Sequence, residues 1–231
     1  MTRYDFTTQP NRLNQNTMKW HEAESDPELL ELWVADMDFL PVPEIRDAVI
    51  NYAETHIFGY PYPSDELYQS IIDWEKNQHG YSVDKASIVL IEGVVPAIST
   101  AIQSFTKEDD AVLINTPVYP SFARSVRLNN RKLIENSLVK VNGHFEIDFE
   151  QLERDIVDND VKLYVFCSPH NPGGRVWTKE ELTMVADLCQ KHGVLLVSDE
   201  IHQDLALYGN KHISLNTISN AYKDFTLVLS S

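Results

Sequence analysis

The feature that most constrains the fold is an alternation, from residue 87 onward, between short apolar runs and segments of helical periodicity. The apolar runs are nearly continuous, which is typical of strands buried on both faces of a sheet. They fall at residues 87–91, 110–114, 161–167, 194–198 and 225–229. Because strands that alternate with helices pair in parallel, the sequence predicts an α/β fold with a mostly parallel sheet covered by helices on both faces.

Local signals bound several of the intervening elements. Thr178 and Glu181 have the spacing of a capping box, and Gly193 is a typical helix stop, so a helix is expected between them. The pair at residues 142–143 is Asn-Gly, the strongest short signal for a hairpin. Further helices are expected at residues 94–105, 119–128 and 148–157.

The N-terminal part has a different character. Residues 1–42 show no sustained period but contain several large aromatic side chains, so this arm is expected to lie against the chain's body or a partner. A helix is predicted from Pro43 towards Gly59, and a second one after Ser64. The buried stripe of that second helix is expected to contain Leu67, Tyr68, Ile71 and Ile72, with Trp74 at its edge. We therefore expect an arm over residues 1–42 and an incomplete α/β domain over residues 43–231.

Composition excludes several classes of partner. The sequence of 231 residues contains 19 Lys and Arg against 35 Asp and Glu, a net charge of −16, so binding to nucleic acid or an anionic membrane is not expected. No apolar run approaches the roughly 20 residues that cross a bilayer. The two cysteines, Cys167 and Cys189, lie in apolar segments, which favours a reducing cytoplasm, and no metal-ligand set is predicted.

Polar or rigid residues follow four of the predicted strands, at the sheet edge where α/β proteins bind ligands. Gly93 begins a turn into a helix that suits a phosphate, and Tyr119 stands between two prolines as a ring able to stack on a planar ligand. Taken alone, a plain strand-to-helix turn explains Gly93 better than a phosphate site does, and a packing role explains Tyr119 at least as well as stacking on a ligand. The Pro- and Gly-rich loop 168–175 and Asp199, at the end of an apolar strand, favour function more strongly. Together they match the needs of a phosphorylated aromatic cofactor.

These motifs resemble those of the fold-type I pyridoxal-phosphate enzymes in the class I/II aminotransferase superfamily. Within it, the chain is most similar to the cystathionine β-lyase branch of the MalY/PatB type. The motifs that carry the resemblance are WVADMDF at residues 33–39, IFGY at 57–60, PVY at 117–119, CSPHNPGGRVW at 167–177 and DEIHQDL at 199–205. The resemblance covers the whole chain, and it makes residues 43–231 the large, pyridoxal-phosphate-binding domain of this fold.

The resemblance implies a role for each residue of a cofactor site. Asp199 is expected to pair with the protonated pyridine nitrogen and Asn171 to hydrogen-bond the phenolic oxygen, a contact that His202 shares. Tyr119 is expected to stack on the ring.

Other residues are expected at the cofactor's phosphate and at the substrate. The resemblance assigns the phosphate to the amides of Val94 and Val95, to Ser231, and to Tyr60 from the neighbouring subunit of a homodimer. Trp33, Val34 and Ala35 are expected at the substrate carboxylate. The resemblance implies no catalytic role for the loop residues His170 and Arg175.

The implied activity is a carbon–sulfur β-lyase that cleaves L-cystathionine or cysteine-like amino acids. The lysine that binds the cofactor covalently in this family is expected just beyond Ser231, where the sequence ends. Two alternatives remain open. An aminotransferase shares the early steps of the reaction, and a non-catalytic regulator would retain the fold and the cofactor site without activity.

Overall fold

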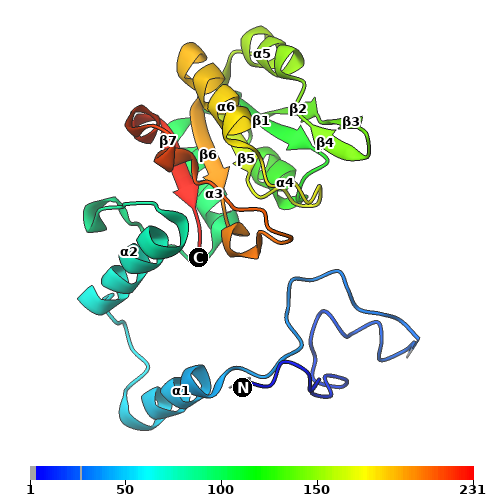
Figure 1. Cartoon of the computed structure of the whole chain (residues 1–231), viewed down its shortest axis with the longest axis vertical. Helices are drawn as coiled ribbons and strands as arrows, with labels where there is room; N and C mark the ends of the chain where they lie inside the picture. Colours follow the sequence, from blue (N-terminus) through cyan, green and yellow to red (C-terminus); the bar gives the residue numbers. More distant parts are fainter. Residues whose placement is uncertain (1–3, 27) are drawn as a thin grey trace. The chain divides into compact units, whose positions relative to one another are not determined.

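The structure is a computed structural model that describes residues 4–26 and 28–231 (Figure 1). It contains two compact units, Met1–Tyr62 and Pro63–Ser231. The sheet and the helices that cover it belong to the second unit. The domain boundary expected after residue 42 stays a prediction about the whole protein.

The second unit is built on a five-stranded sheet in which every neighbouring pair is parallel, in the order β2-β1-β5-β6-β7. The strands are β1 (Ala111–Thr116), β2 (Lys132–Ser137), β5 (Val161–Cys167), β6 (Leu195–Asp199) and β7 (Thr226–Leu229). The order reverses between β1 and β5, since β2 lies on one side of β1 and β5 to β7 lie on the other. Such a reversal is the point at which α/β sheets bind ligands, beyond the carboxyl ends of the strands.

Helices cover both faces of this sheet. Two buried clusters of apolar side chains contain alternate residues of the strands, as the two-residue period of a strand requires. On one face Tyr164 and Phe166 join the side chains of α5 (Phe149–Asp158) and α6 (Lys179–His192). On the other, Val165 joins those of α3 (Val94–Phe105) and α4 (Ser121–Leu128). The predicted α/β fold is therefore confirmed.

Several local predictions hold in detail. Helix α6 begins with the capping box of Thr178 and Glu181 and ends at Gly193, whose φ is +67°. The side chain of Asp148 caps α5 by accepting a hydrogen bond from the backbone of Gln151. The Asn-Gly turn joins the antiparallel strands β3 (Val139–Val141) and β4 (His144–Glu146). Each of these signals acts within a few residues, and this is why the sequence was enough to predict them.

One strand prediction is wrong, and one strand was missed. The strand expected at residues 87–91 is absent: a short 3-10 helix, η1 (Lys85–Ser87), precedes an irregular segment in which Val89 is 83% exposed. An apolar run becomes a strand only beside another strand, and in the described residues none pairs with this segment. Conversely, β2 was missed because Lys132 and Glu135 interrupt its apolar pattern. It is an edge strand that buries only alternate residues.

Helix α2 (Asp65–His79) begins at the predicted cap, where Ser64 accepts a hydrogen bond from the backbone of Leu67. The predicted buried stripe holds only in part: Tyr68, Ile71 and Ile72 are half-buried, whereas Leu67 and Trp74 are exposed. The one fully buried residue of this helix is Glu75. The reason is that α2 contacts the polar segment after β6 rather than an apolar core. That segment contains the short helices η2 (Gln203–Leu205), η3 (Leu215–Thr217) and η4 (Asn220–Asp224).

The first unit contains an irregular arm and helix α1 (Pro43–Thr55), which buries none of its residues. The arm is held by polar contacts at Asp38, whose carboxylate accepts hydrogen bonds from Arg12 (2.7 Å), Lys19 (2.7 Å) and the Trp20 indole (2.9 Å). Neither here nor elsewhere in the described residues is a helix long and apolar enough to span a membrane.

Candidate functional site

Backbone hydrogen bonds join the loops that follow four strands at the carboxyl edge of the sheet. The Tyr119 amide donates to the Asn171 carbonyl (3.1 Å), which links the loops after β1 and β5. The Ser168 amide donates to the Asp199 carbonyl (2.9 Å). The amide of Glu200 donates to the carbonyl of Leu229 (2.8 Å) and so ties the ends of β6 and β7. The predicted residues on these loops are therefore neighbours on one edge.

Asp199 is a buried carboxylate that can accept more hydrogen bonds than the protein provides. It is 4% exposed, and burial raises its pKa. Its carboxylate accepts one hydrogen bond, from the Ile201 amide at 3.1 Å, and it has no ion pair with any described residue. A positively charged ligand group that donates a hydrogen bond to Asp199 would compensate the cost of burying its carboxylate charge.

The adjacent acid, Glu200, has a different environment. Its carboxylate accepts hydrogen bonds from the Ser198 hydroxyl (3.0 Å) and the Leu215 amide (3.2 Å), and it pairs with the His212 ring at 2.8 Å. These contacts satisfy Glu200 within the protein. When two neighbouring acids differ in this way, the one with fewer partners is the better candidate for chemistry, which here is Asp199.

The loop after β5 is shaped by a buried histidine. The Gly173 amide donates to His170 Nδ1 at 3.1 Å, and burial lowers the pKa of His170 to about 4, so the ring is neutral. A Cβ at Gly173 would lie 2.6 Å from His170 Nδ1, so this turn has room only for glycine. Arg175 is held by Glu181 (2.7 Å) and lies over the Trp177 ring. These contacts shape the loop and give His170 and Arg175 a structural task within it.

This loop also presents Asn171. Its side-chain amide has no hydrogen-bond partner among the described residues, although its backbone is fixed by the bond to Tyr119. Tyr119 is 43% exposed and packs edge-on against Phe122, which leaves part of its ring accessible. An available amide and an accessible ring thus lie on connected loops. Their contacts with a ligand stay predictions.

The first turn of α3 is suited to an anion. It follows Gly93, which has φ +120° and gives no side-chain cap, so the amides of Val94 and Val95 start a helix with no side chain covering them. The first N–H groups of a helix have no partner inside it, and the helix dipole is positive there. This first turn is therefore able to hold a phosphate.

The positions of the other predicted site residues do not by themselves indicate a ligand. His202 is half-buried between β6 and η2, and Ser231 is exposed, two positions after the end of β7. Tyr60 and the residues 33–35 belong to the first unit, where the rings of Tyr60 and Trp33 are both exposed. Their roles at the cofactor or substrate stay predictions.

Sequence reasoning missed a buried polar chain at the end of β1. Asn115 is almost fully buried, accepts a hydrogen bond from the Tyr164 hydroxyl and donates one to Asn136 (2.9 Å). Asn136 in turn donates to Asp155 of α5 (2.8 Å). The available signal was a polar residue at the end of an otherwise apolar run, the same signal that identified Asp199.

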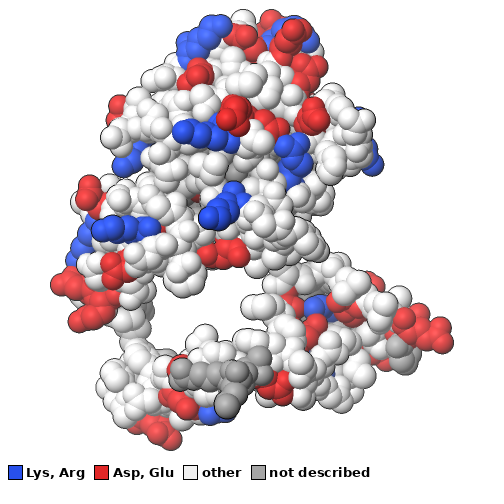
Figure 2. Space-filling view, in the orientation of Figure 1, with Lys and Arg blue, Asp and Glu red and all other residues white. Residues whose placement is uncertain are grey.

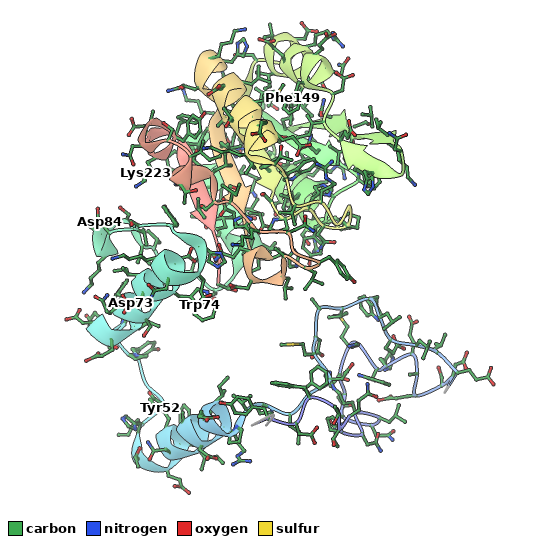
Figure 3. The ribbon with its side chains drawn as sticks, viewed as in Figure 1. Tyr52, Asp73, Trp74, Asp84, Phe149 and Lys223 are labelled. Carbon is green, nitrogen blue, oxygen red and sulfur yellow. The ribbon has the colours of Figure 1, made fainter. Side chains whose placement is uncertain are left out.

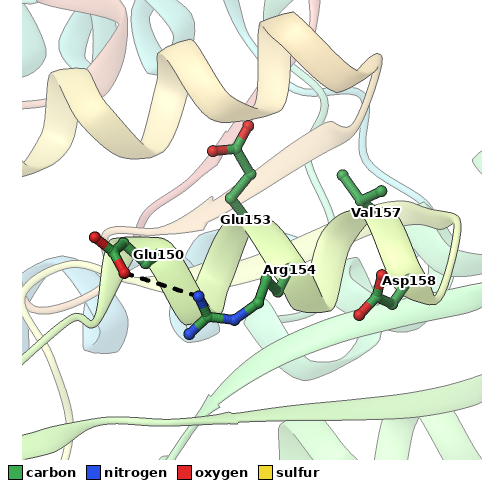
Figure 4. A pocket seen from close by; sticks show the side chains of 5 residues that line it. All are labelled: Glu150, Glu153, Arg154, Val157 and Asp158. Carbon is green, nitrogen blue, oxygen red and sulfur yellow. Dashed lines mark ion pairs between the residues drawn. The ribbon is translucent and has the colours of Figure 1, made fainter.

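A depression on α5, away from the carboxyl edge of the sheet, is lined by Glu150, Glu153, Arg154, Val157 and Asp158, and among these residues Glu150 forms an ion pair with Arg154 (3.8 Å) (Figure 4). On the face in Figure 2, acidic and basic side chains of this unit are interspersed. No cluster of three metal-ligating side chains occurs in the part of the chain that the structure describes.

Comparison with known proteins agrees with this geometry. Residues 27–231 match the sequence profile of the family described as Aminotransferase class I and II. The chain belongs to the class I and II aminotransferase family. Its relatives in this family include the cystathionine β-lyase PatB of Bacillus subtilis, which is 38% identical over 98% of this chain and 59% of its own length.

Two solved structures of this family superpose on nearly the whole chain. Cystalysin from Treponema denticola, which contains a pyridoxal 5'-phosphate cofactor, has a TM-score of 0.93 and 37% identity. A pyridoxal-phosphate-bound C–S lyase from Staphylococcus hominis has a TM-score of 0.91 and 30% identity. Both comparisons cover 99% of this chain and 59% of the other, so the chain spans about three fifths of these family members.

Proposed function

We propose that the whole protein to which this chain belongs binds pyridoxal 5'-phosphate at the carboxyl edge of the sheet. The residues fit the group on chemical grounds. The buried, under-partnered carboxylate of Asp199 suits a protonated pyridine nitrogen, and the free amides that begin α3 suit a phosphate. A phosphorylated, aromatic cation satisfies both requirements at once.

Each side chain at this edge then has a defined task. Asp199 holds a proton on the ring nitrogen through a charge-assisted hydrogen bond. Asn171 and His202 donate to the phenolic oxygen, and the Tyr119 ring stacks on the cofactor's face. The amides of Val94 and Val95, together with Ser231, bind the phosphate. When bound, the cofactor supplies an electron sink that allows bonds at the substrate's α and β carbons to break.

We further propose that the reaction is carbon–sulfur β-elimination, which converts L-cystathionine or a cysteine-like amino acid into pyruvate, ammonia and a thiol. The observation that carries this choice is the similarity to PatB, a cystathionine β-lyase, over 98% of the chain. The superposition on the pyridoxal-phosphate-bound C–S lyase from Staphylococcus hominis supports it. Trp33, Val34 and Ala35 are proposed to line the substrate's carboxylate end.

The functional unit is proposed to be a cytoplasmic homodimer in which Tyr60 reaches the phosphate bound by the neighbouring subunit. The exposure of the Tyr60 ring and of the apolar face of α1 supports this, since both need a partner to be covered.

Aminotransferase activity is the second candidate, because the family includes enzymes of that class. Amino transfer leaves the substrate's amino group on the enzyme, so a keto acid is needed to take it up before the next turnover, whereas β-elimination releases it as ammonia and needs no keto acid. A non-catalytic regulator that retains the cofactor site is the third candidate.

One assay distinguishes the three. The full-length protein is supplied with L-cystathionine and no keto acid, and pyruvate and free thiol are measured against the amount of enzyme. A lyase releases both over many turnovers. An aminotransferase converts at most one equivalent and recovers turnover when a keto acid is added, and a regulator releases nothing while still showing bound cofactor in its absorption spectrum. Either of the last two results would refute the lyase proposal.

A further inference from the structure

A buried amide joins α2 to the end of β7. The side-chain nitrogen of Gln203 donates to Glu75 Oε1 at 2.8 Å and to Ser230 Oγ at 2.6 Å, so both of its hydrogens are used. Gln203 is 3% exposed and Glu75 is almost as buried. Residues 75 and 203 are 128 positions apart in the sequence. Gln203 lies in the DEIHQDL motif at residues 199–205, but the resemblance gives it no role, and Glu75 belongs to none of the motifs described above.

The contact belongs to a larger set of bonds around the same place. The backbone N–H of Gln203 donates to the backbone carbonyl of Glu200 (2.8 Å). The backbone N–H of Glu200 in turn donates to the carbonyl of Leu229 at the end of β7 (2.8 Å). Asp204 pairs with His79 at 2.9 Å and accepts a longer bond from the Trp74 indole, a side chain that Figure 3 labels on α2. Helix α2 therefore holds both the segment after β6 and the end of β7.

Taken by itself, the contact between Glu75 and Gln203 lowers the stability of the fold. Glu75 Oε2 and Gln203 Oε1 are buried and have no hydrogen-bond partner in the described part of the chain. Buried polar groups left unsatisfied lower stability, and an apolar pair of similar size would fill this space at less cost. A local rule broken in this way points to a functional constraint.

The constraint is provided by the neighbours of the two residues. Gln203 directly follows His202 and comes four positions after Asp199, and Ser230 directly precedes Ser231. A shift of the Gln203 amide would move the residues proposed for the ring and those proposed for the phosphate. The amide is thus placed to set the spacing between the ends of β6 and β7.

We propose that Gln203, anchored by Glu75, is a positioning residue that holds Ser230 and thereby the phosphate-binding end of β7. This inference rests on the proposed function, because it assumes that Ser231 contacts the phosphate of pyridoxal phosphate. In this role Gln203 acts through its bond to Ser230 and not through a contact with the cofactor or the substrate.

The test measures the affinity of the full-length apoprotein for pyridoxal phosphate by its absorption on binding. Gln203→Ala is expected to weaken binding about tenfold, the effect of losing one or two net hydrogen bonds. Ser230→Ala, which removes only a hydroxyl, is expected to weaken binding to a similar extent. Because Gln203→Ala already removes the bond to Ser230, the double variant should bind no more weakly than Gln203→Ala alone.

Two further variants calibrate the result. Glu75→Gln keeps an acceptor oxygen for the Gln203 amide and is expected to bind within about threefold of the unmodified protein. Gln190→Ala, at an exposed position of α6, serves as the matched control and should leave the affinity unchanged.

Each outcome has a distinct meaning. If the unmodified protein binds pyridoxal phosphate and Ser230→Ala binds equally well, the positioning role is refuted, and this holds even if Gln203→Ala fails to fold. A lower unfolding midpoint for Gln203→Ala with unchanged affinity would also refute it, since the contact would then serve stability alone. Failure of the unmodified protein to bind would refute the proposed function itself, and the positioning role with it.

Discussion

The two units contain helices of similar length that bury their apolar side chains to opposite extents. In α3, four of 12 residues are buried, and Ile102 is 0% exposed. In α1, none of 13 residues is buried, and Ile50 is 49% exposed. The spacing of apolar residues predicts both helices equally well. Whether those residues are buried depends on another surface that packs against the apolar face of the helix. The sheet supplies that surface in residues 63–231, whereas the arm in the first unit is held by polar contacts at Asp38.

The largest expected effect tests this contrast with one substitution in each helix. Ile102→Ala should destabilise the chain by about 2–5 kcal/mol, because it leaves a cavity beside the sheet. Ile50→Ala should change stability by less than about 0.5 kcal/mol, as is usual for a surface position. Urea unfolding of both variants measures the difference.

The same pair of variants in the full-length protein would sharpen the comparison. A cost for Ile50→Ala that approaches that of Ile102→Ala would mean that the rest of the protein, or a second copy, covers α1. Equal costs in the 231-residue chain would instead contradict the contrast between the units.

A second prediction concerns the carboxyl edge of the sheet. Asp199→Asn in the full-length protein should lower turnover about 100-fold while much of the cofactor stays bound, since a neutral amide stabilises a pyridinium poorly. Asp158→Asn, on the exposed face of α5, is the matched control and should leave turnover unchanged. Steady-state rates and the absorption of bound cofactor are the measurements. Near-normal turnover by the Asp199→Asn variant would remove Asp199 from the chemistry.

The dependence of burial on distant parts of the chain also explains which features could be predicted from the sequence. Strand β5 and helix α6 were predicted because their apolar runs and capping box are local signals. The segment at residues 87–91 was misread because an apolar run says nothing about whether another strand lies beside it. The carboxylate of Asp199 was found from its place after an apolar strand. The contact of Glu75 with Gln203 was not, because it joins residues 128 positions apart whose types carry no shared motif.

A third prediction uses acid to separate the two units. Burial lowers the pKa of His170 to about 4, below its ordinary value of 6.5, so the unfolded chain binds a proton more readily than the folded one. The stability from neutral His170 is present above pH 6.5 and is lost as the pH falls towards 4. Between pH 6.5 and pH 5 the loss is about 1.5 kcal/mol. Urea unfolding at a series of pH values measures it, and His170→Asn, which keeps an acceptor for Gly173, should abolish this part of the dependence.

The first unit should lose stability only at a lower pH than the second unit. Hydrogen bonds from Lys19 and Trp20 lower the pKa of Asp38 to about 2, against an ordinary value of 3.8. The stability it contributes is present above pH 3.8 and is lost only as the pH falls towards 2. Amide hydrogen exchange at pH 5 should therefore report a weakened second unit and an intact arm, and the reverse order would contradict the contrast.

The smallest expected effect is a partial recovery of activity, and it tests whether the exposed surface of the first unit completes a site on another copy. Tyr60→Ala and Asp199→Ala are each expected to inactivate the full-length enzyme. If the two residues serve a site formed by different chains, random exchange makes half of the dimers mixed, and each mixed dimer has one intact site of two, which predicts about a quarter of the unmodified activity. Mixing either variant with itself is the control. If exchange is demonstrated by a mass difference between tagged chains and activity still stays at the parental level, Tyr60 acts within its own chain or not at all. The exposed face of the first unit would then need another explanation than a shared active site.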